Sequence, residues 1–357
     1  MRATIIGAGV AGLACAVELA ERGTEVEVLE RSASLGGSCC SWFAGGMLAP
    51  WCERVSAPPL IVALADEGFA WWGEKYPGMQ RRGSLVLAHA RDAGELKHFA
   101  RRTQQYEWLD AEGIAALEPD LAGRFEQGLY FKDEAHIDPR AALGALAARV
   151  QALGGTIHFA AEAPPAPAAR GEYRIDCTGL AARTVLTDLR GVKGEMLHLQ
   201  APDVSLSRPV RVLHPRTPVY VVPRGDGHYM VGATMIESDA PSRISARSML
   251  ELLGAVYALH PGFGEAEILE IGTGVRPAFP DNLPRLRPRD GTLYVNGLYR
   301  HGFLAAPAMA RRAAAFVLEG REAPEVMQST SRSTASGARC APRTSPPRSP
   351  SSASPRR

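Results

Sequence analysis

The chain has no long apolar run. Nowhere in its 357 residues do about 18 apolar residues follow one another, the length that a membrane-spanning helix needs. Glycines also interrupt the apolar N-terminal segment at positions that a signal peptide does not require. We therefore predict a cytoplasmic protein with no membrane contact.

Cysteine is scarce and is not spaced for metal binding. The six cysteines form no C-x-x-C pair and no Cys/His cluster at zinc-ligand spacing. Cys39 and Cys40 are adjacent, and we expect two reduced, packed thiols there in preference to a strained disulfide ring. The sequence therefore predicts neither a metal site nor a disulfide framework.

Net charge is also small, at +2 for the whole chain. Residues 328–357 hold six arginines and no acid, which leaves a net charge of −4 on the rest. A body of this charge does not indicate a nucleic-acid partner. Segment 323–357 is rich in serine, proline and arginine and has almost nothing to bury, so we expect a disordered tail.

The first thirty residues have the pattern of a strand–helix–strand unit. The pattern predicts a strand at Ala3–Ile6, a helix at Val10–Arg22 that is stopped by Gly23, and a strand at Glu25–Glu30. The turn between the first strand and the helix reads GAGVAG and matches G-x-G-x-x-G. This context distinguishes the motif from a chance match, and it predicts a dinucleotide-binding fold.

Each motif position has a physical role. Gly7 permits the tight turn, Gly9 lets the backbone approach a pyrophosphate, and Gly12 allows close packing of helix on strand. The N–H groups of Val10 and Ala11 at the helix start are suited to the anion. Glu30 closes the second strand, where its carboxylate can accept both ribose hydroxyls and disfavours NADP. An ordinary helix start beside a surface acid is the alternative interpretation.

A second glycine-rich passage distinguishes FAD from NAD. After Arg31 the chain contains Gly36-Gly37, and then Ala44-Gly45-Gly46-Met47. A flavin needs small residues where backbone lies against its ring, whereas NAD gives no reason for such a passage. The sequence therefore favours FAD.

Eight motifs in order resemble the D-amino-acid oxidase family of FAD oxidoreductases, most closely the thiamine-pathway glycine oxidases. The likeness covers nearly all of residues 1–320. The motifs are GAGVAG (7–12), GGMLAP (45–50), DCTG (176–179), VKGEM (192–196), VYVVPR (219–224), VGATM (231–235), GTGVRP (272–277) and NGLYRHGFLAAP (296–307). The loop at 160–171 is shorter than the corresponding loop of the family. The basic C-terminal tail has no counterpart in the family.

The resemblance and the strand pattern imply an α/β architecture. A Rossmann-like FAD-binding domain carries an inserted α+β substrate domain built on a large antiparallel sheet. We expect helices near Leu60–Tyr76, Pro139–Leu153, Ala246–Leu259 and Pro307–Leu318. The expected divisions are 1–80, 139–190 and 270–322 for the FAD-binding domain, and 81–138 and 191–269 for the substrate domain.

The resemblance also implies the substrate site. Arg276 matches the arginine that holds the substrate carboxylate, and a guanidinium can grip such a group with two parallel bonds. Tyr220 matches a tyrosine whose hydroxyl lies over the site, although a packed core aromatic stays open. Arg300 matches a second arginine at the site entrance and flavin edge. Met47 and Met235 match pocket-lining positions, with plain core packing as the alternative.

The same resemblance implies how the cofactor is held. The N–H groups of the segment from Arg300 should face the flavin N1–C2=O edge, where the positive helix end stabilises the reduced flavin. No cysteine lies in 276–310, so attachment there is non-covalent. The expected cofactor-binding residues are Gly7, Gly9, Val10, Ala11, Gly12, Glu30, Arg31, Gly37, Gly45, Gly46, Met47, Thr178, Gly179, Arg300, His301, Gly302, Phe303 and Leu304.

The expected reaction is oxidation of glycine or a related small amine, with hydride transfer to flavin N5 and release of an imino acid and hydrogen peroxide. The resemblance implies that the imine is passed to a thiazole-forming enzyme. Three alternatives stay open: a broader D-amino-acid or sarcosine oxidase, a dehydrogenase with an acceptor other than oxygen, and a non-catalytic flavin-binding scaffold. The oligomeric state is open, with a homo-oligomer as one option.

Overall fold

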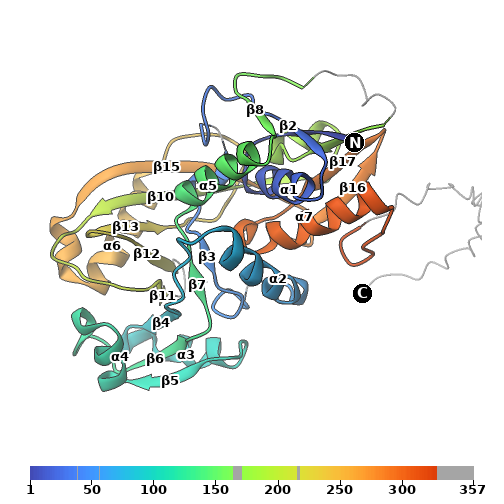
Figure 1. Ribbon diagram of the computed structural model, residues 1–357. Helices are drawn as coiled ribbons and strands as arrows, with labels where there is room; N and C mark the ends of the chain where they lie inside the picture. The colour runs from blue at the N-terminus through green and yellow to red at the C-terminus, as the bar shows by residue number, and fades with distance from the viewer. Residues whose placement is uncertain (38, 56, 164–170, 215–217, 328–357) are drawn as a thin grey trace, which may run out of the picture.

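The computed structural model describes residues 1–37, 39–55, 57–163, 171–214 and 218–327. Most of the expected tail and of the short loop at 160–171 therefore lies outside the described residues. Two large sheets organise the molecule. Figure 1 shows α1, α5 and α7 in one half, and β10, β12, β13 and α6 in the other.

The smaller sheet is the predicted dinucleotide fold. Its six strands run in the order β16-β17-β9-β1-β2-β8, and every neighbouring pair is parallel except β16 and β17. Parallel strands place their carboxyl ends on one edge, where α/β proteins bind ligands. The strands are β1 (Arg2–Ile6), β2 (Glu25–Leu29), β8 (Thr156–His158), β9 (Glu172–Asp176), β16 (Arg285–Arg289) and β17 (Thr292–Asn296).

Four helices pack in the core of this half: α1 (Val10–Ala20), α2 (Pro59–Lys75), α5 (Pro139–Ala152) and α7 (Gly302–Glu319). Helix α1 is apolar almost all round and is buried along most of its length. Such a helix belongs in an interior. It therefore fixes the turn before it against the sheet.

Helix α7 begins at Gly302, five residues before the predicted start at Pro307. Proline has no N–H, so the carbonyl of Phe303 loses its intrahelical partner. Trp72 Nε1 donates to that carbonyl at 2.7 Å instead. The tryptophan of α2 satisfies the oxygen that Pro307 leaves free, so the helix continues through the proline.

The larger sheet confirms the predicted antiparallel layer. Its strands run in the order β14-β10-β13-β12-β11-β4-β6-β5. Strand β15 lies off this path and pairs with β10. In the described part of this sheet, β4 and β11 are the one parallel pair. The strands are β4 (Ser84–Ala88), β5 (Glu107–Asp110), β6 (Gln127–Phe131), β10 (Arg190–Gln200), β11 (Val210–Leu213), β12 (Val219–Gly225), β13 (His228–Gly232), β14 (Ile236–Glu237) and β15 (Glu267–Ala278).

Strand β15 differs from the expected domain division, which put 270–278 with the FAD-binding domain. It pairs with β10 over nearly its whole length and so belongs to the larger sheet. The sequence did not show this placement, because β10 and β15 are far apart in the chain and local residue patterns do not reveal which strands pair. The remaining α-helices and strands of the described residues are α3 (Ala93–Ala100), α4 (Ala111–Leu117), α6 (Ala246–Leu259), and the pair β3 (Met47–Leu48) and β7 (Ala135–His136).

Within the described ranges, each helix is too short or too polar to cross a bilayer.

Candidate active site

A cavity of about 1530 Å³ lies where the two sheets meet. Its walls come from the carboxyl ends of β1, β2, β9 and β17 in the smaller sheet, and from β10, β12 and β15 in the larger one. The start of α7 closes one side. Cavities at the carboxyl ends of parallel strands are the usual place for a dinucleotide.

The cavity brings together most of the residues that the sequence singled out. Gly12 and Leu304 do not line it, because Gly12 packs against Gly7 and Leu304 lies in the core against Gly68. The predicted residues that line it are Gly7, Gly9, Val10, Ala11, Glu30, Arg31, Gly37, Gly45, Gly46, Met47, Thr178, Gly179, Tyr220, Met235, Arg276, Arg300, His301, Gly302 and Phe303.

The start of α1 has the geometry of an anion site. Gly7 adopts φ +98°, and a Cβ on Gly12 would lie 1.9 Å from the Gly7 carbonyl oxygen, so both positions require glycine. Among the described residues, a Cβ on Gly9 would make ordinary contacts with Ser41 Oγ at 3.5 Å and Cys39 Sγ at 3.7 Å, so no clash within the protein requires glycine there. Here the helix presents N–H groups that have no intrahelical partner. This cradle fits a pyrophosphate.

Glu30 lies at the end of β2 and is 6% exposed. Its carboxylate accepts the N–H of Ala8 at 2.8 Å and the N–H of Ser32 at 2.9 Å. These bonds fix the side chain beside the glycine turn, on the cavity wall. A carboxylate held in this way is placed to accept ribose hydroxyls.

The second glycine passage is tightly packed. Gly46 adopts φ +70°, and a Cβ on Gly45 would lie 2.8 Å from the ring of Tyr220. Arg224 Nη2 donates to the Gly45 carbonyl at 2.8 Å and so ties this passage to β12. Burial raises the pKa of the Tyr220 hydroxyl, so this group stays protonated at neutral pH and can donate a hydrogen bond.

Arg276 extends from β15 over the neighbouring strand β10. A Cβ on Gly194 would lie 2.3 Å from Arg276 Nη2 and 2.5 Å from its Cζ. Position 194 must therefore lack a side chain for the guanidinium to lie there. Its Nη1 donates to the carbonyl of Thr234 at 3.2 Å. Among the described residues, no acidic side chain forms a salt bridge with Arg276.

The start of α7 forms another wall of the cavity. Arg300 adopts φ +58°, and the next residue, His301, is the N-cap of α7. Burial lowers the pKa of His301 to about 4, so its ring is neutral at pH 7. His301 therefore adds no charge of its own to the positive end of the helix dipole. Asn296 Nδ2 donates to the Gly179 carbonyl at 2.8 Å and so ties the end of β17 to the turn after β9.

Sequence reasoning missed a buried acid in the cavity wall, Glu53. Its Oε1 accepts from Arg211 Nη1 at 2.6 Å, and its Oε2 is bonded to Arg300 Nη2. Burial alone raises the pKa of Glu53, but the charges of Arg211 and Arg300 outweigh it and lower this pKa to about 2. The acid is therefore ionised at neutral pH. An isolated glutamate in the apolar passage GGMLAPWCE was the available signal.

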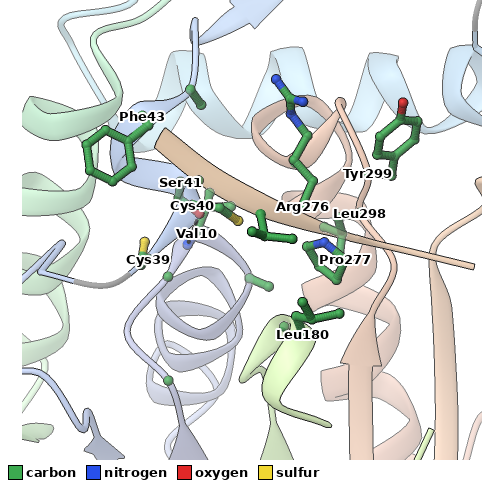
Figure 2. A pocket seen from close by; sticks show the side chains of 18 of the residues that line it. Val10, Cys39, Cys40, Ser41, Phe43, Leu180, Arg276, Pro277, Leu298 and Tyr299 are labelled. Atoms are coloured by element: carbon green, nitrogen blue, oxygen red, sulfur yellow. Dashed lines mark hydrogen bonds between the residues drawn. The ribbon is translucent and has the colours of Figure 1, made fainter. Parts of the chain in front are cut away.

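Segment 39–41 was missed as well, because its short 3₁₀ turn has no periodic pattern. Ser41 Oγ accepts the N–H of Val10 at 3.3 Å, and Cys39 and Cys40 line the same cavity. Figure 2 shows Val10, Cys39 and Ser41 gathered at the start of α1, with Arg276 elsewhere in the same cavity. Burial raises the pKa of Cys40 to about 12, so this thiol stays protonated. In the described part of the chain, no group of three or more potential ligands is placed to hold a metal.

A second buried carboxyl, Glu134, supports the loop that carries Glu53. Its Oε1 accepts the N–H of Trp51 at 2.9 Å and of Cys52 at 2.8 Å. Its Oε2 is buried and, among the described residues, has no hydrogen-bond partner of good geometry, although the Ser84 side chain is close enough to interact with it. Burial raises the pKa of Glu134 from 4.5 to about 8. This group therefore binds its proton more tightly in the folded protein than in the unfolded chain.

Glu134 should make stability depend on pH. Because its folded pKa is raised, its contribution is complete below pH 4.5 and is lost as the pH rises toward about 8. Glu134→Gln keeps the accepting oxygen and abolishes the titration. Between about pH 6 and pH 8, the free energy of unfolding of the parent should fall, relative to the variant, by about 1.4 kcal/mol per pH unit. Urea unfolding at several pH values measures this difference.

The control for that experiment is Glu126→Gln, which removes an acid at an exposed position of the loop before β6. This variant should keep the parent's slope of the free energy of unfolding against pH. If the free energies of unfolding of the parent and of Glu134→Gln changed in parallel with pH, Glu134 would be ionised in the folded protein.

Comparison with known proteins agrees with this geometry. Residues 2–316 match the family model described as FAD dependent oxidoreductase. The "Putative thiamine biosynthesis oxidoreductase ThiO" of Rhizobium etli is 53% identical, over 91% of this chain and 99% of that protein. The "Glycine oxidase" of Pseudomonas aeruginosa is 28% identical, over 90% of this chain and 95% of that one. The crystal structure of glycine oxidase from Geobacillus kaustophilus superposes with a TM-score of 0.76 at 24% identity, covering 90% and 96% of the two chains.

Proposed function

Because the chain belongs to the family of FAD-dependent oxidoreductases, we propose that it oxidises glycine or a closely related small amine. The protein is an FAD-dependent amino-acid oxidase. The choice of glycine, hydride transfer as the mechanism, oxygen as acceptor and a cytoplasmic location are predictions. The observation that carries the proposal is the guanidinium of Arg276. It lines the cavity whose other end fits a dinucleotide, and it has no acidic counter-ion among the described residues.

The residues of the glycine turn would hold FAD. The N–H groups at the start of α1 would bind the pyrophosphate, and Glu30 would accept hydrogen bonds from the ribose. The start of α7 would present its N–H groups to the ring. When bound, the flavin supplies the two-electron acceptor that no side chain can provide.

The chain itself would bind and orient the substrate. Arg276 would take the carboxylate with two parallel N–H groups, and the protonated hydroxyl of Tyr220 would donate a further bond. Fixing the carboxylate fixes the neighbouring α-carbon, and orientation of this kind can supply much of the rate enhancement. No side chain need remove a proton, because the substrate can bind as the free amine.

A substrate panel tests the proposal. We expect initial rates of peroxide release to be highest with glycine or sarcosine, and lower with D-alanine and D-proline. Higher rates with the larger D-amino acids would favour a broader oxidase. A flavin that bleaches with glycine but reoxidises slowly in air would indicate a dehydrogenase. A yellow protein that no amine bleaches would contradict an enzymatic role.

We further propose that the imine product passes to a thiazole-forming enzyme. The name of the 53%-identical relative, a thiamine biosynthesis oxidoreductase, supports this step. An imine hydrolyses in water, so direct use by the next enzyme would protect it. Trapping of the product in a coupled reaction with a thiazole synthase would measure the transfer.

A further inference from the structure

Glu53 lies in the cavity wall between two arginines. Its two oxygens are bonded to Arg211 and Arg300, one oxygen to each. The side chains of Glu53 and Arg211 are each 9% exposed, and that of Arg300 is 12% exposed. A charge group this deeply buried keeps its geometry, because moving one member would leave another unpaired.

Arg300 has both terminal nitrogens engaged by the protein. Nη2 is bonded to Glu53, and Nη1 lies 2.9 Å from Met235 Sδ. A guanidinium grips a carboxylate in the two-bond mode only when two of its N–H groups are free to face it. Arg300 shares the single negative charge of Glu53 with Arg211, and each of its terminal nitrogens makes one bond to the protein, so its charge is partly offset and fewer of its N–H groups face the cavity.

Arg276 is the contrasting cation in the same cavity. Its hydrogen bond goes to a neutral carbonyl, that of Thr234, and not to an acid. It lies over the bare backbone of Gly194. Of the two arginines, Arg276 can take a substrate carboxylate, whereas the charge of Arg300 is partly compensated by Glu53, which Arg211 shares.

We propose that Glu53 restricts this site to substrates with a single carboxylate. It does so by engaging Arg300 and by lowering the positive charge that a second anion would meet there. The inference rests on the proposed function and deepens it: the substrates are monocarboxylic small amines such as glycine or sarcosine. Dicarboxylic analogues are rejected. Glu53 is a positioning residue that acts through Arg300.

The binding of simple carboxylates tests the proposal without catalytic turnover. Isothermal titration of the holoenzyme should show acetate binding at least about 10-fold more tightly than malonate, a shift worth about 1.4 kcal/mol. Glu53→Gln should lower the Kd of malonate, relative to the Kd of acetate, by about 10-fold or more. Equal affinities in the parent, or a variant in which both affinities change by the same factor, would overturn the proposal.

A matched control is Glu270→Gln. Glu270 also pairs with an arginine, Arg140, through two bonds, but it does not line the cavity. Its removal should leave the acetate-to-malonate ratio unchanged. A ratio that shifts equally in both variants would show that any lost acid has the same effect, and would also overturn the proposal.

Glu53→Gln leaves Arg211 buried without its acid, so the variant could fail to fold. The double variant Glu53→Gln/Arg211→Met removes that unpaired cation and places an apolar side chain beside Phe99, over which Arg211 now lies. It should show the same shift toward malonate. An unshifted ratio in the folded double variant would contradict the role of Glu53.

Turnover with sarcosine and iminodiacetate separates this inference from the proposed function. Iminodiacetate is sarcosine with one added carboxylate, so the ratio of the two kcat/KM values isolates the second charge. We expect the parent to favour sarcosine by about 100-fold or more, or about 2.7 kcal/mol. If no amine reduces the flavin while the acetate-to-malonate ratio shifts as expected, the proposed function fails alone. If sarcosine is oxidised and neither ratio moves in Glu53→Gln, the present inference fails alone.

Discussion

Replacing Arg276 with alanine should lower kcat/KM for glycine by about 10²- to 10³-fold, mainly through KM, while FAD stays bound. The guanidinium lies in the cavity over Gly194, and its Nη1 donates to the Thr234 carbonyl. Its charge therefore has no competing acid among the described residues. Losing one partner of a hydrogen-bonded charge pair costs about 2–5 kcal/mol, which spans this range. Steady-state kinetics and the flavin absorbance of the purified variant measure the two effects.

Two further variants calibrate the loss. Arg276→Lys keeps the charge but not the two-bond grip, so kcat/KM should lie between the parent and Arg276→Ala. Arg247→Ala, on an exposed part of α6 with only a 3.9 Å ion pair, should leave the kinetics unchanged. Unaltered affinity for glycine in Arg276→Ala would remove the carboxylate role from this residue.

Gly12→Ala should produce a protein that no longer retains FAD. The added Cβ would lie 1.9 Å from the carbonyl oxygen of Gly7, which is backbone and cannot move aside without displacing the turn. Gly7 is itself held at φ +98°, so the glycine turn has little freedom to adjust. Moving the turn away from the helix start disrupts the anion cradle. We expect FAD affinity to fall at least 100-fold, about 2.7 kcal/mol.

Retention of flavin after gel filtration, and a titration of the apoprotein with FAD, measure that loss. Gly144→Ala is the matched control, because it makes the same change inside α5 where a Cβ would meet nothing within 4 Å. It should keep FAD and be slightly more stable, since alanine favours helix. Circular dichroism separates lost cofactor binding from lost folding. A yellow Gly12→Ala protein with normal affinity would contradict the role of this glycine.

Local patterns were sufficient wherever the physical requirement is local. The turn at Gly7–Gly12 follows from backbone sterics within six residues, and helix α1 follows from its apolar composition. The predicted helices at Pro139–Leu153 and Ala246–Leu259 agree with α5 and α6 to within one residue at each end. Each begins at a polar N-cap, and such capping is visible in the sequence.

Other features depend on partners far away in the chain. The residue pattern placed the start of α7 five residues late, at Pro307, because proline is favoured in the first turn of a helix and the donor that compensates for it, Trp72, is more than 200 residues away. The resemblance had placed a helix start in the segment from Arg300, which agrees with Gly302. The pairing of β15 with β10 likewise depends on contact across a long separation. The resemblance supplied Arg276 and Tyr220, whereas composition alone would not separate them from a surface arginine and a core tyrosine.

By itself, the sequence determined the strand–turn–helix of the dinucleotide fold and the presence of a second, mostly antiparallel sheet. Tertiary structure alone decided how the charges in that cavity are shared. Glu53 and its two arginine partners, Arg211 and Arg300, are separated by more than 150 residues in each case. The strength of a charge interaction depends on distance and burial, and neither can be read from sequence spacing. Folding therefore set which arginine is compensated and which can take an anion.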